Sequence, residues 1–257
     1  MYMKYFKEKS RLLFPLLLLL LWQVSSTLGL LQSDKIPSPI QIISGIRELA
    51  LIGLPSGSSL FMHCFESLLR VAAGFIVAAA LGITFGILIG WLRFLRNMLT
   101  PIIETIRPIP PLAWIPLAIL WFGIGFKSAA FIIFLGCFFP ILLSTISGVL
   151  SVDKILIEAA KTLGAKENKI FTNVLVPAAT PSIFTGIRIG LGIGWMTLVA
   201  AEFTGVKSGY GLGYMIMVAR DIQRPDLVIG GMATIGLMGY LLDAALRKLE
   251  ARMLKWR

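Results

Sequence analysis

Few residues of this chain have the types and spacing that catalysis or metal binding requires. There is one histidine, His63, and there are two cysteines, Cys64 and Cys137. The cysteines form no C-x-x-C pair, and no Cys/His cluster has the spacing of a zinc site. We interpret His63 as a surface residue, and we predict no catalytic residue and no metal site. A buried Ser–His pair leaves no mark in a sequence, so a membrane enzyme stays a distant alternative.

The glycines between Glu202 and Asp226 suggest a phosphate-binding loop by composition only. The chain nowhere contains the G-x-x-x-x-G-K-[ST] pattern that cradles the phosphates of ATP. The sequence thus gives the chain no visible means of binding ATP. We expect Gly209–Tyr214 to form an irregular turn that leads into a helix over Leu212–Asp221.

A charged stretch over Ser151–Pro177 separates two apolar runs. Its apolar residues recur every fourth position, at Ile155, Ala159 and Leu163, which is typical of one helical face. Ser151 or Asp153 can cap this helix, and Gly164 stands where a helix commonly ends in a left-handed turn. The pattern predicts a short amphipathic helix, and then a second short helix followed by a proline.

The same stretch resembles the EAA loop of ABC importer permeases. The resemblance lies in Glu158-Ala159-Ala160, in Gly164, and in Val174-Leu175-Val176-Pro177, where valines replace an isoleucine and a leucine of the family pattern. A second segment, Arg107–Gly125, is similar to permeases of the nitrate, sulfonate and taurine group. The resemblance implies that the loop couples to an ATPase through Glu158, Ala159, Ala160, Gly164 and Pro177.

The resemblance also implies a fold and a set of partners. The fold would be all-α: a type I ABC importer permease-like bundle of six transmembrane helices with a cytoplasmic coupling helix, in a bacterial-type plasma (inner) membrane. Two ABC ATPase subunits would bind ATP and Mg²⁺, with no cofactor in this chain. A second permease copy would complete a homodimer, although a heterodimer would give the same sequence pattern. A periplasmic or lipid-anchored solute-binding protein would reach the outer segments 32–67 and 202–226, and the first of these is equally readable as a plain connector.

The amino-acid composition indicates a membrane protein independently of that resemblance. The 257 residues are 57% hydrophobic, with a mean hydropathy of +0.86, which is too apolar for a soluble domain. A membrane span needs about 20 apolar residues. Six runs approach that length: Leu12–Leu31, Val71–Trp91, Ile109–Gly123, Ala129–Leu150, Ala178–Ala201 and Leu227–Leu246. We expect one permease domain over 1–257, with the tail and first span in 1–35, core spans in 60–250 and the coupling loop in 151–177.

Two of these runs have unusual features. The first follows several lysines, as a signal peptide would, but it is long for one and lacks a clear A-x-A site, so we interpret it as a retained span. The third is short and rich in proline, and Pro108-Ile109-Pro110-Pro111 should break or kink the chain at a membrane boundary.

The net charge of +11 is explained by orientation in the membrane. With the amino terminus in the cytoplasm, 16 lysines and arginines fall on the inner side and 6 on the outer side. This asymmetry follows the positive-inside rule and places both termini in the cytoplasm. No nucleic-acid partner is needed to account for the basic balance.

Two predicted spans carry a glycine at every fourth position. The glycines are Gly82, Gly86 and Gly90 in the second span, and Gly186, Gly190 and Gly194 in the fifth. Such a ridge lets another helix approach closely. The ridges suit either helices that slide during transport or static close packing, and both interpretations place these spans inside the bundle.

Arg188 is the first candidate for contact with cargo in the translocation path. It stands 11 residues after Pro177, which is about 16 Å along a helix and about half of a ~30 Å hydrocarbon core. It should therefore face the bundle interior or water, either to bind an anionic cargo or to meet backbone carbonyls or an acid on a neighbouring helix. Trp195 and Trp114 are further path candidates.

Two classes of function remain open at this point. The first is the permease subunit of an ATP-driven importer that works by alternating access. Its cargo would be a small anion such as an organic sulfonate (taurine or an alkanesulfonate), with nitrate, bicarbonate or a small heterocycle as alternatives. The second is a self-sufficient secondary transporter or channel. Such a protein normally places coupling carboxylates or broken helices at the midplane, where this sequence shows only Glu202 and Asp243, near span ends.

Overall fold

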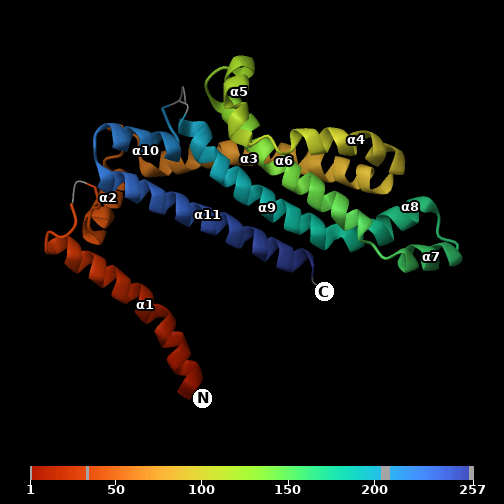
Figure 1. Ribbon diagram of the computed structural model, residues 1–257, viewed down its shortest axis with the longest axis horizontal. Helices are drawn as coiled ribbons and strands as arrows, with labels where there is room; N and C mark the ends of the chain where they lie inside the picture. Colours follow the sequence, from red (N-terminus) through yellow and green to blue (C-terminus); the bar gives the residue numbers. More distant parts are fainter. Residues whose placement is uncertain (1, 33–34, 204–208, 255–257) are drawn as a thin grey trace. The chain divides into compact units, whose positions relative to one another are not determined.

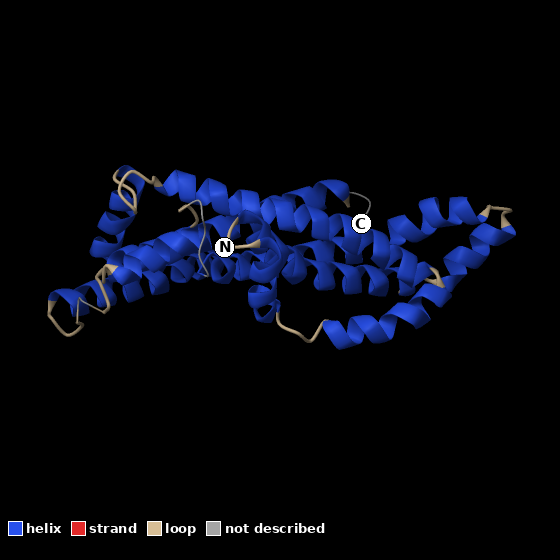
Figure 2. Cartoon of the chain, turned by 90° about the horizontal axis from the view of Figure 1, so that it is seen from above, coloured by secondary structure: helices blue, strands red, loops and turns tan. Residues whose placement is uncertain are grey.

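The chain is built from helices throughout the part that the structure describes. The computed structural model describes residues 2–32, 35–203 and 209–254, with side chains from residue 13 onward. Within these ranges every regular element is a helix and no strand occurs (Figure 2). The predicted all-α class is therefore confirmed. Gly205 and Lys207, which the sequence analysis assigned to the outer side, lie outside the described residues.

The helices follow one another in the order that Figure 1 labels. The α-helices are α1 (Tyr2–Thr27), α2 (Pro39–Leu51), α3 (Leu60–Trp91), α4 (Arg93–Ile106), α5 (Ile115–Phe122), α6 (Phe126–Leu150), α7 (Lys154–Thr162), α8 (Glu167–Ile170), α9 (Val176–Phe203), α10 (Leu212–Asp221) and α11 (Pro225–Met253). A 3₁₀-helix, η1 (Pro111–Trp114), precedes α5, and a π-helical turn, η2 (Phe171–Leu175), joins α8 to α9.

The described residues form four or five candidate membrane spans, so the predicted number of six is not confirmed. By length and composition, four described helical stretches can cross a membrane: 60–91, 126–150, 167–203 and 225–253. A fifth candidate is the pair formed by α4 with η1 and α5, which bends by 84° at the prolines where the sequence predicted a break. The first predicted span corresponds to a shorter apolar stretch, Leu13–Thr27 of α1.

The chain divides into two compact units, each with its own packing. The first unit comprises residues 1–64 and 210–237, and the second comprises 65–209 and 238–257. In the first unit, α11 packs closely on two helices because its glycines have no side chain: Gly230 lies against Ile46 of α2, and Gly231 lies against Ile216 of α10. The prediction of one domain over 1–257 stays a prediction.

The second unit is organised around α6. Helix α9 runs beside α6 along its length (Figure 1), and both glycine ridges face α6. The ridge of α3 lies against one row of α6 residues: Ile141, Thr145 and Val149. The ridge of α9 lies against another row: Cys137, Ile141 and Ser144. Helix α6 is thus held between two smooth helical surfaces, and whether those surfaces also slide stays a prediction.

The contacts of these glycines predict which positions tolerate a methyl group. A Cβ added at Gly190 would lie 2.9 Å from the Cys137 carbonyl oxygen, whereas one added at Gly192 would meet nothing within 4 Å. Gly190→Ala should therefore lower the thermal midpoint of the purified protein, since overpacking typically costs about 1–3 kcal/mol. Gly192→Ala is the matched control on the same helix and should leave the midpoint unchanged or raise it, because alanine favours helix. Equal midpoints for the two variants, measured by tryptophan fluorescence in detergent, would contradict the packing.

Candidate coupling and transport sites

The charged stretch forms a capped helix that ends in a left-handed turn. The Ile155 backbone N–H donates to Asp153 Oδ1 at 2.9 Å, which caps the start of α7. Gly164 has φ +79°, a conformation that costs glycine little and other residues more. Pro177 is the second residue of α9 and directly follows η2, inside the helical stretch that runs from Glu167 to Phe203.

Helix α7 exposes its apolar side chains. No residue of α7 is buried, and Ile155 is 70% exposed. Leu163, which directly follows the helix, is 88% exposed. Glu158 and Ala159 are also exposed, and Ala160 is half-buried. Exposed apolar residues gathered on one short helix are typical of a surface that binds another protein.

The segment that joins this loop to α9 contains buried residues, whereas α7 has none. Ile170 of α8 and Leu175 of η2 are each 1% exposed, and Leu175 belongs to an apolar cluster with Val149 and Ala179. Phe171 meets Trp91 edge to face, with ring centroids 5.9 Å apart. Because α8, η2 and α9 form one continuous helical stretch, these contacts hold its amino-terminal end in place.

Arg188 forms an ion pair with an acid on a neighbouring helix. Its Nε donates to Asp243 Oδ1 of α11 at 2.8 Å, and Asp243 Oδ2 accepts from Arg247 at 2.8 Å. The side chains of Arg188 and Asp243 remain 44% and 37% exposed. An arginine near the bilayer centre costs about 2.5–3.5 kcal/mol or more on lipid, so this face needs water or protein against it.

The three path candidates do not gather in one place. Arg188 and Trp195 line a common pocket of about 190 Å³ together with Asp243 and Gly239. Trp114 lies instead in η1, packed on the apolar cluster that contains Ala118 and Ala129. In the sequence, Asp243 is only an acid near a span end and Arg247 is one of several basic residues near the carboxyl end, so no sequence pattern connects either residue with Arg188.

A second ion pair lies fully buried between α3 and α9. Arg70 NH1 donates to Glu202 Oε1 at 2.8 Å, and Ser67 Oγ donates to the same oxygen at 2.8 Å. The side chains of Arg70 and Glu202 are 1% and 0% exposed. Glu66 adds a carboxylate 3.2 Å from Arg70 NH2. Both charges were visible in the sequence as unusual for a span, which is the signal that could have marked them as a pair.

The prediction that His63 is a surface residue is wrong. His63 is fully buried, and its Nδ1 lies 3.0 Å from the Gly211 backbone nitrogen. The reason is that α3 begins at Leu60, well before the predicted span start at Val71, so His63 lies inside a helix and under the turn before α10.

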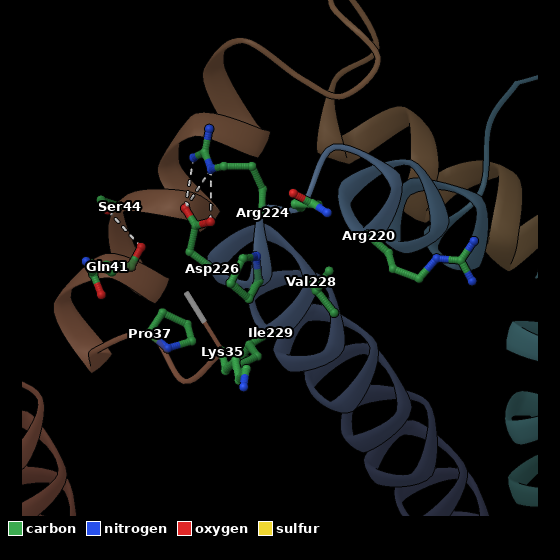
Figure 3. A pocket seen from close by; sticks show the side chains of 11 residues that line it. Lys35, Pro37, Gln41, Ser44, Arg220, Arg224, Asp226, Val228 and Ile229 are labelled. Atoms are coloured by element: carbon green, nitrogen blue, oxygen red, sulfur yellow. Dashed lines mark hydrogen bonds and ion pairs between the residues drawn. The ribbon is translucent and has the colours of Figure 1, made fainter. Parts of the chain in front are cut away.

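The two predicted outer segments meet in the first unit. Residues of 35–44 and 220–229 line an open pocket of about 930 Å³ (Figure 3). Figure 3 shows the Arg224 guanidinium facing the Asp226 carboxylate, and Arg224 also donates to Glu48 of α2 at 2.6 Å. The hydrogen bonds that Arg224 donates to Asp226 and Glu48 raise the pKa of Arg224 above its ordinary value, so it stays charged at any physiological pH. These bonds tie α2 to the start of α11.

Comparison with protein-family models decides which family these features belong to. Residues 82–255, more than half of the chain, match the model described as "Binding-protein-dependent transport system inner membrane component". The chain belongs to this family. The permease is thus a multi-pass inner-membrane transport component, and the resemblance seen in its coupling loop is confirmed at the level of the family.

Individual relatives agree with that assignment. The permease is 40% identical to the taurine transport system permease protein of Escherichia coli K12, over 93% of this chain and 86% of the relative. It is 36% identical to the nitrate import permease protein of Synechocystis sp. PCC 6803, over 91% and 85%. A solved chain of the MetNI methionine ABC transporter in inward-facing conformations aligns with a TM-score of 0.59 at 21% identity, over 74% of this chain and 95% of that one. At this identity the alignment supports the fold alone.

The buried ion pair gives a stability prediction for the permease. Arg70→Met breaks the ion pair of the buried Glu202 with Arg70, and breaking such a pair typically costs about 3–5 kcal/mol. The variant should therefore lose folded protein in detergent melting, and the double variant Arg70→Met, Glu202→Leu should recover a large part of the loss. Arg247→Met is the matched control, because its 44% exposed pair should contribute only about 0–1 kcal/mol. A double variant no more stable than Arg70→Met would contradict this account.

Proposed function

We propose that this permease is the membrane subunit of an ATP-driven importer for a small organic sulfonate, such as taurine or an alkanesulfonate. The observation that carries the proposal is the 40% identity to a taurine permease, against 36% to a nitrate permease. Both relatives are named for the transport of small molecules with an anionic group. The pair of arginines on α9 and α11, neutralised by only one aspartate, supports an anionic cargo.

Two ABC ATPase subunits supply the energy and hold ATP and Mg²⁺. Each ATPase receives one α7 in a cleft, where Ile155, Leu156 and Leu163 become buried and Glu158 presents its charge. Support comes from the exposure of these apolar side chains on a helix with no buried residue. When the ATPase dimer closes, it moves both α7 helices, and the anchored base passes the motion to α9.

A second copy of the permease encloses the path. The face of α9 and α11 that carries Arg188 and Asp243 is exposed in the single chain, and charges at this depth are costly on lipid. In a homodimer the two such faces lie across a wet path, so the charges keep their hydration. Alternating access then consists of opening this path to one side of the membrane at a time.

A solute-binding protein delivers the cargo on the outer side. The surface proposed for this contact is the pocket between α2 and the start of α11, where two segments distant in sequence meet. Arg224 holds these segments together through Glu48 and Asp226. Both termini and α7 lie in the cytoplasm, as the distribution of lysine and arginine indicates.

Reconstitution tests the importer and its cargo. Proteoliposomes with the permease, its ATPase and its binding protein should take up labelled taurine or ethanesulfonate only when ATP is supplied on the ATPase side. Nitrate, bicarbonate and a neutral heterocycle are the comparison cargoes, and a hydrolysis-deficient ATPase is the control. Uptake that is independent of ATP would overturn the proposal in favour of a secondary transporter. Preferred uptake of one of the comparison cargoes would overturn the sulfonate assignment.

Gly164 provides the sharpest test of the coupling role. A side chain there would meet nothing within 4 Å, so substitutions act through the backbone at φ +79° rather than through a clash. Gly164→Val should reach the membrane but lower ATP-driven uptake about tenfold or more, because a β-branched residue strongly disfavours positive φ. Gly164→Asn is the control at the same position and should keep most of the activity, since asparagine tolerates this conformation.

Membrane vesicles of known orientation test on which side of the membrane α7 lies. The ATPase should co-sediment with inside-out vesicles that contain the parental permease and should not co-sediment with right-side-out vesicles. The opposite result would contradict a cytoplasmic α7.

Uptake at the parental rate by the Gly164→Val variant would show that Gly164 has no role in the coupling mechanism.

A further inference from the structure

One carboxylate bridges two guanidinium groups on the α9 and α11 face of the second unit. Asp243 uses Oδ1 for Arg188 and Oδ2 for Arg247, each at 2.8 Å. The three side chains together carry a net charge of +1 at neutral pH. Arg188 and Arg247 lie on different helices, so their relative position depends on how α9 and α11 are packed.

We propose that Asp243 and Arg247 complete an anion-transfer site with Arg188, in which the sulfonate of the cargo exchanges places with the Asp243 carboxylate. This inference rests on the proposed function, because it assumes an anionic cargo. An incoming anion takes the Arg188 guanidinium from Asp243, and Asp243 then remains on Arg247. When the anion moves on to Arg247, Asp243 returns to Arg188.

The exchange requires an ion pair that can open, and exposure distinguishes this pair from the buried one. Arg188, Asp243 and Arg247 keep 44%, 37% and 44% of their side-chain surface exposed. Ion pairs of that exposure are held weakly, so an anion can compete for the arginine. The Arg70–Glu202 pair, at 1% and 0% exposure, is closed to such competition and holds α3 to α9.

The surroundings offer room and a direction for the exchange. A pocket of about 380 Å³ lies beside the cluster, lined by Thr185, Arg188, Asp243 and Glu250 among others. This volume is within the range of about 300–1,000 Å³ that is usual for small-molecule sites. Arg247 stands one helical turn beyond Asp243 toward the carboxyl end of α11, so the two arginines are successive stations along the helices. Arginine suits this use because its planar fork can bind two oxygens of one anion.

Asp243 has a separate role as the counter-charge that lets the anion leave. With asparagine in its place, the cluster carries +2, and the anion is held more firmly. Asp243→Asn should therefore lower the maximal rate of uptake about fivefold while lowering the half-saturating concentration of loaded binding protein. Arg247→Gln should also slow uptake, because it leaves a neutral Arg188–Asp243 pair. The double variant Asp243→Asn, Arg247→Gln lacks both the counter-charge and the second arginine, so it should be no faster than the slower single variant.

The experiment uses the reconstituted importer with labelled taurine, and Lys248→Gln is the control. Lys248 is an exposed cation next to Arg247 on the same helix, and its loss should leave uptake unchanged. A merely structural ion pair would instead let the double variant recover most of the parental rate, because the two substitutions together leave the net charge at +1. That result, or parental kinetics in Asp243→Asn, would overturn the proposal.

A second measurement needs neither cargo nor partners. Trp195 lines the pocket that also contains Arg188 and Asp243. In a background whose other five tryptophans are replaced by phenylalanine, its quenching by iodide reports the attraction of an anion to this site. Relative to quenching by neutral acrylamide, iodide quenching should rise about twofold in Asp243→Asn and fall in Arg247→Gln. If the parental importer carries no anion but this ratio shifts, the proposed function fails and the anion site stands. If the ratio is unchanged in both variants, the site itself is overturned.

Discussion

The close packing of α6 between α3 and α9 is the constraint on which the second unit depends. Helices in a membrane gain little from the hydrophobic effect when they associate, so close approach and contact area must hold them together. Glycines at every fourth position of α3 and α9 provide that approach, and Ile141 of α6 touches both ridges. The buried Arg70–Glu202 bond then joins α3 directly to α9. These three helices therefore form one cross-linked set.

A continuous helical stretch connects the exposed loop with the transport face. It starts at Glu167, passes through the π-helical turn and ends at Phe203, with Arg188 near the middle of α9. The turn at Gly164 places α7 beside the start of this stretch, where it contacts α8 and η2 (Figure 1). The buried side chains of Ile170 and Leu175 hold the amino-terminal part of this stretch in place, and Leu175 packs against Val149 of α6. The coupling proposed for α7 depends on this continuous stretch, which carries Arg188.

The two interhelical ion pairs of the second unit differ because only one of them keeps exposed surface. Removing one partner of the buried pair leaves a charge out of reach of bulk water, which makes the pair a fixed link. The exposed cluster around Asp243 loses little when it opens, since water or an anion replaces the lost bond. In the proposed mechanism the buried pair keeps the bundle together, and the exposed cluster changes partner while a solute passes.

The sequence by itself determined the helical class, the apolar runs, the proline break before α5, the capped α7 with its glycine turn, and the family. Each of these follows from local periodicity or from the backbone preference of a single residue, such as Gly164. Only the tertiary structure decided that His63 is buried and that both glycine ridges face α6. It also decided that Arg188 meets Asp243, 55 residues away, and that Arg70 meets Glu202, 132 residues away. Such pairs depend on the rotation of each helix about its own axis, and packing between distant segments fixes that rotation.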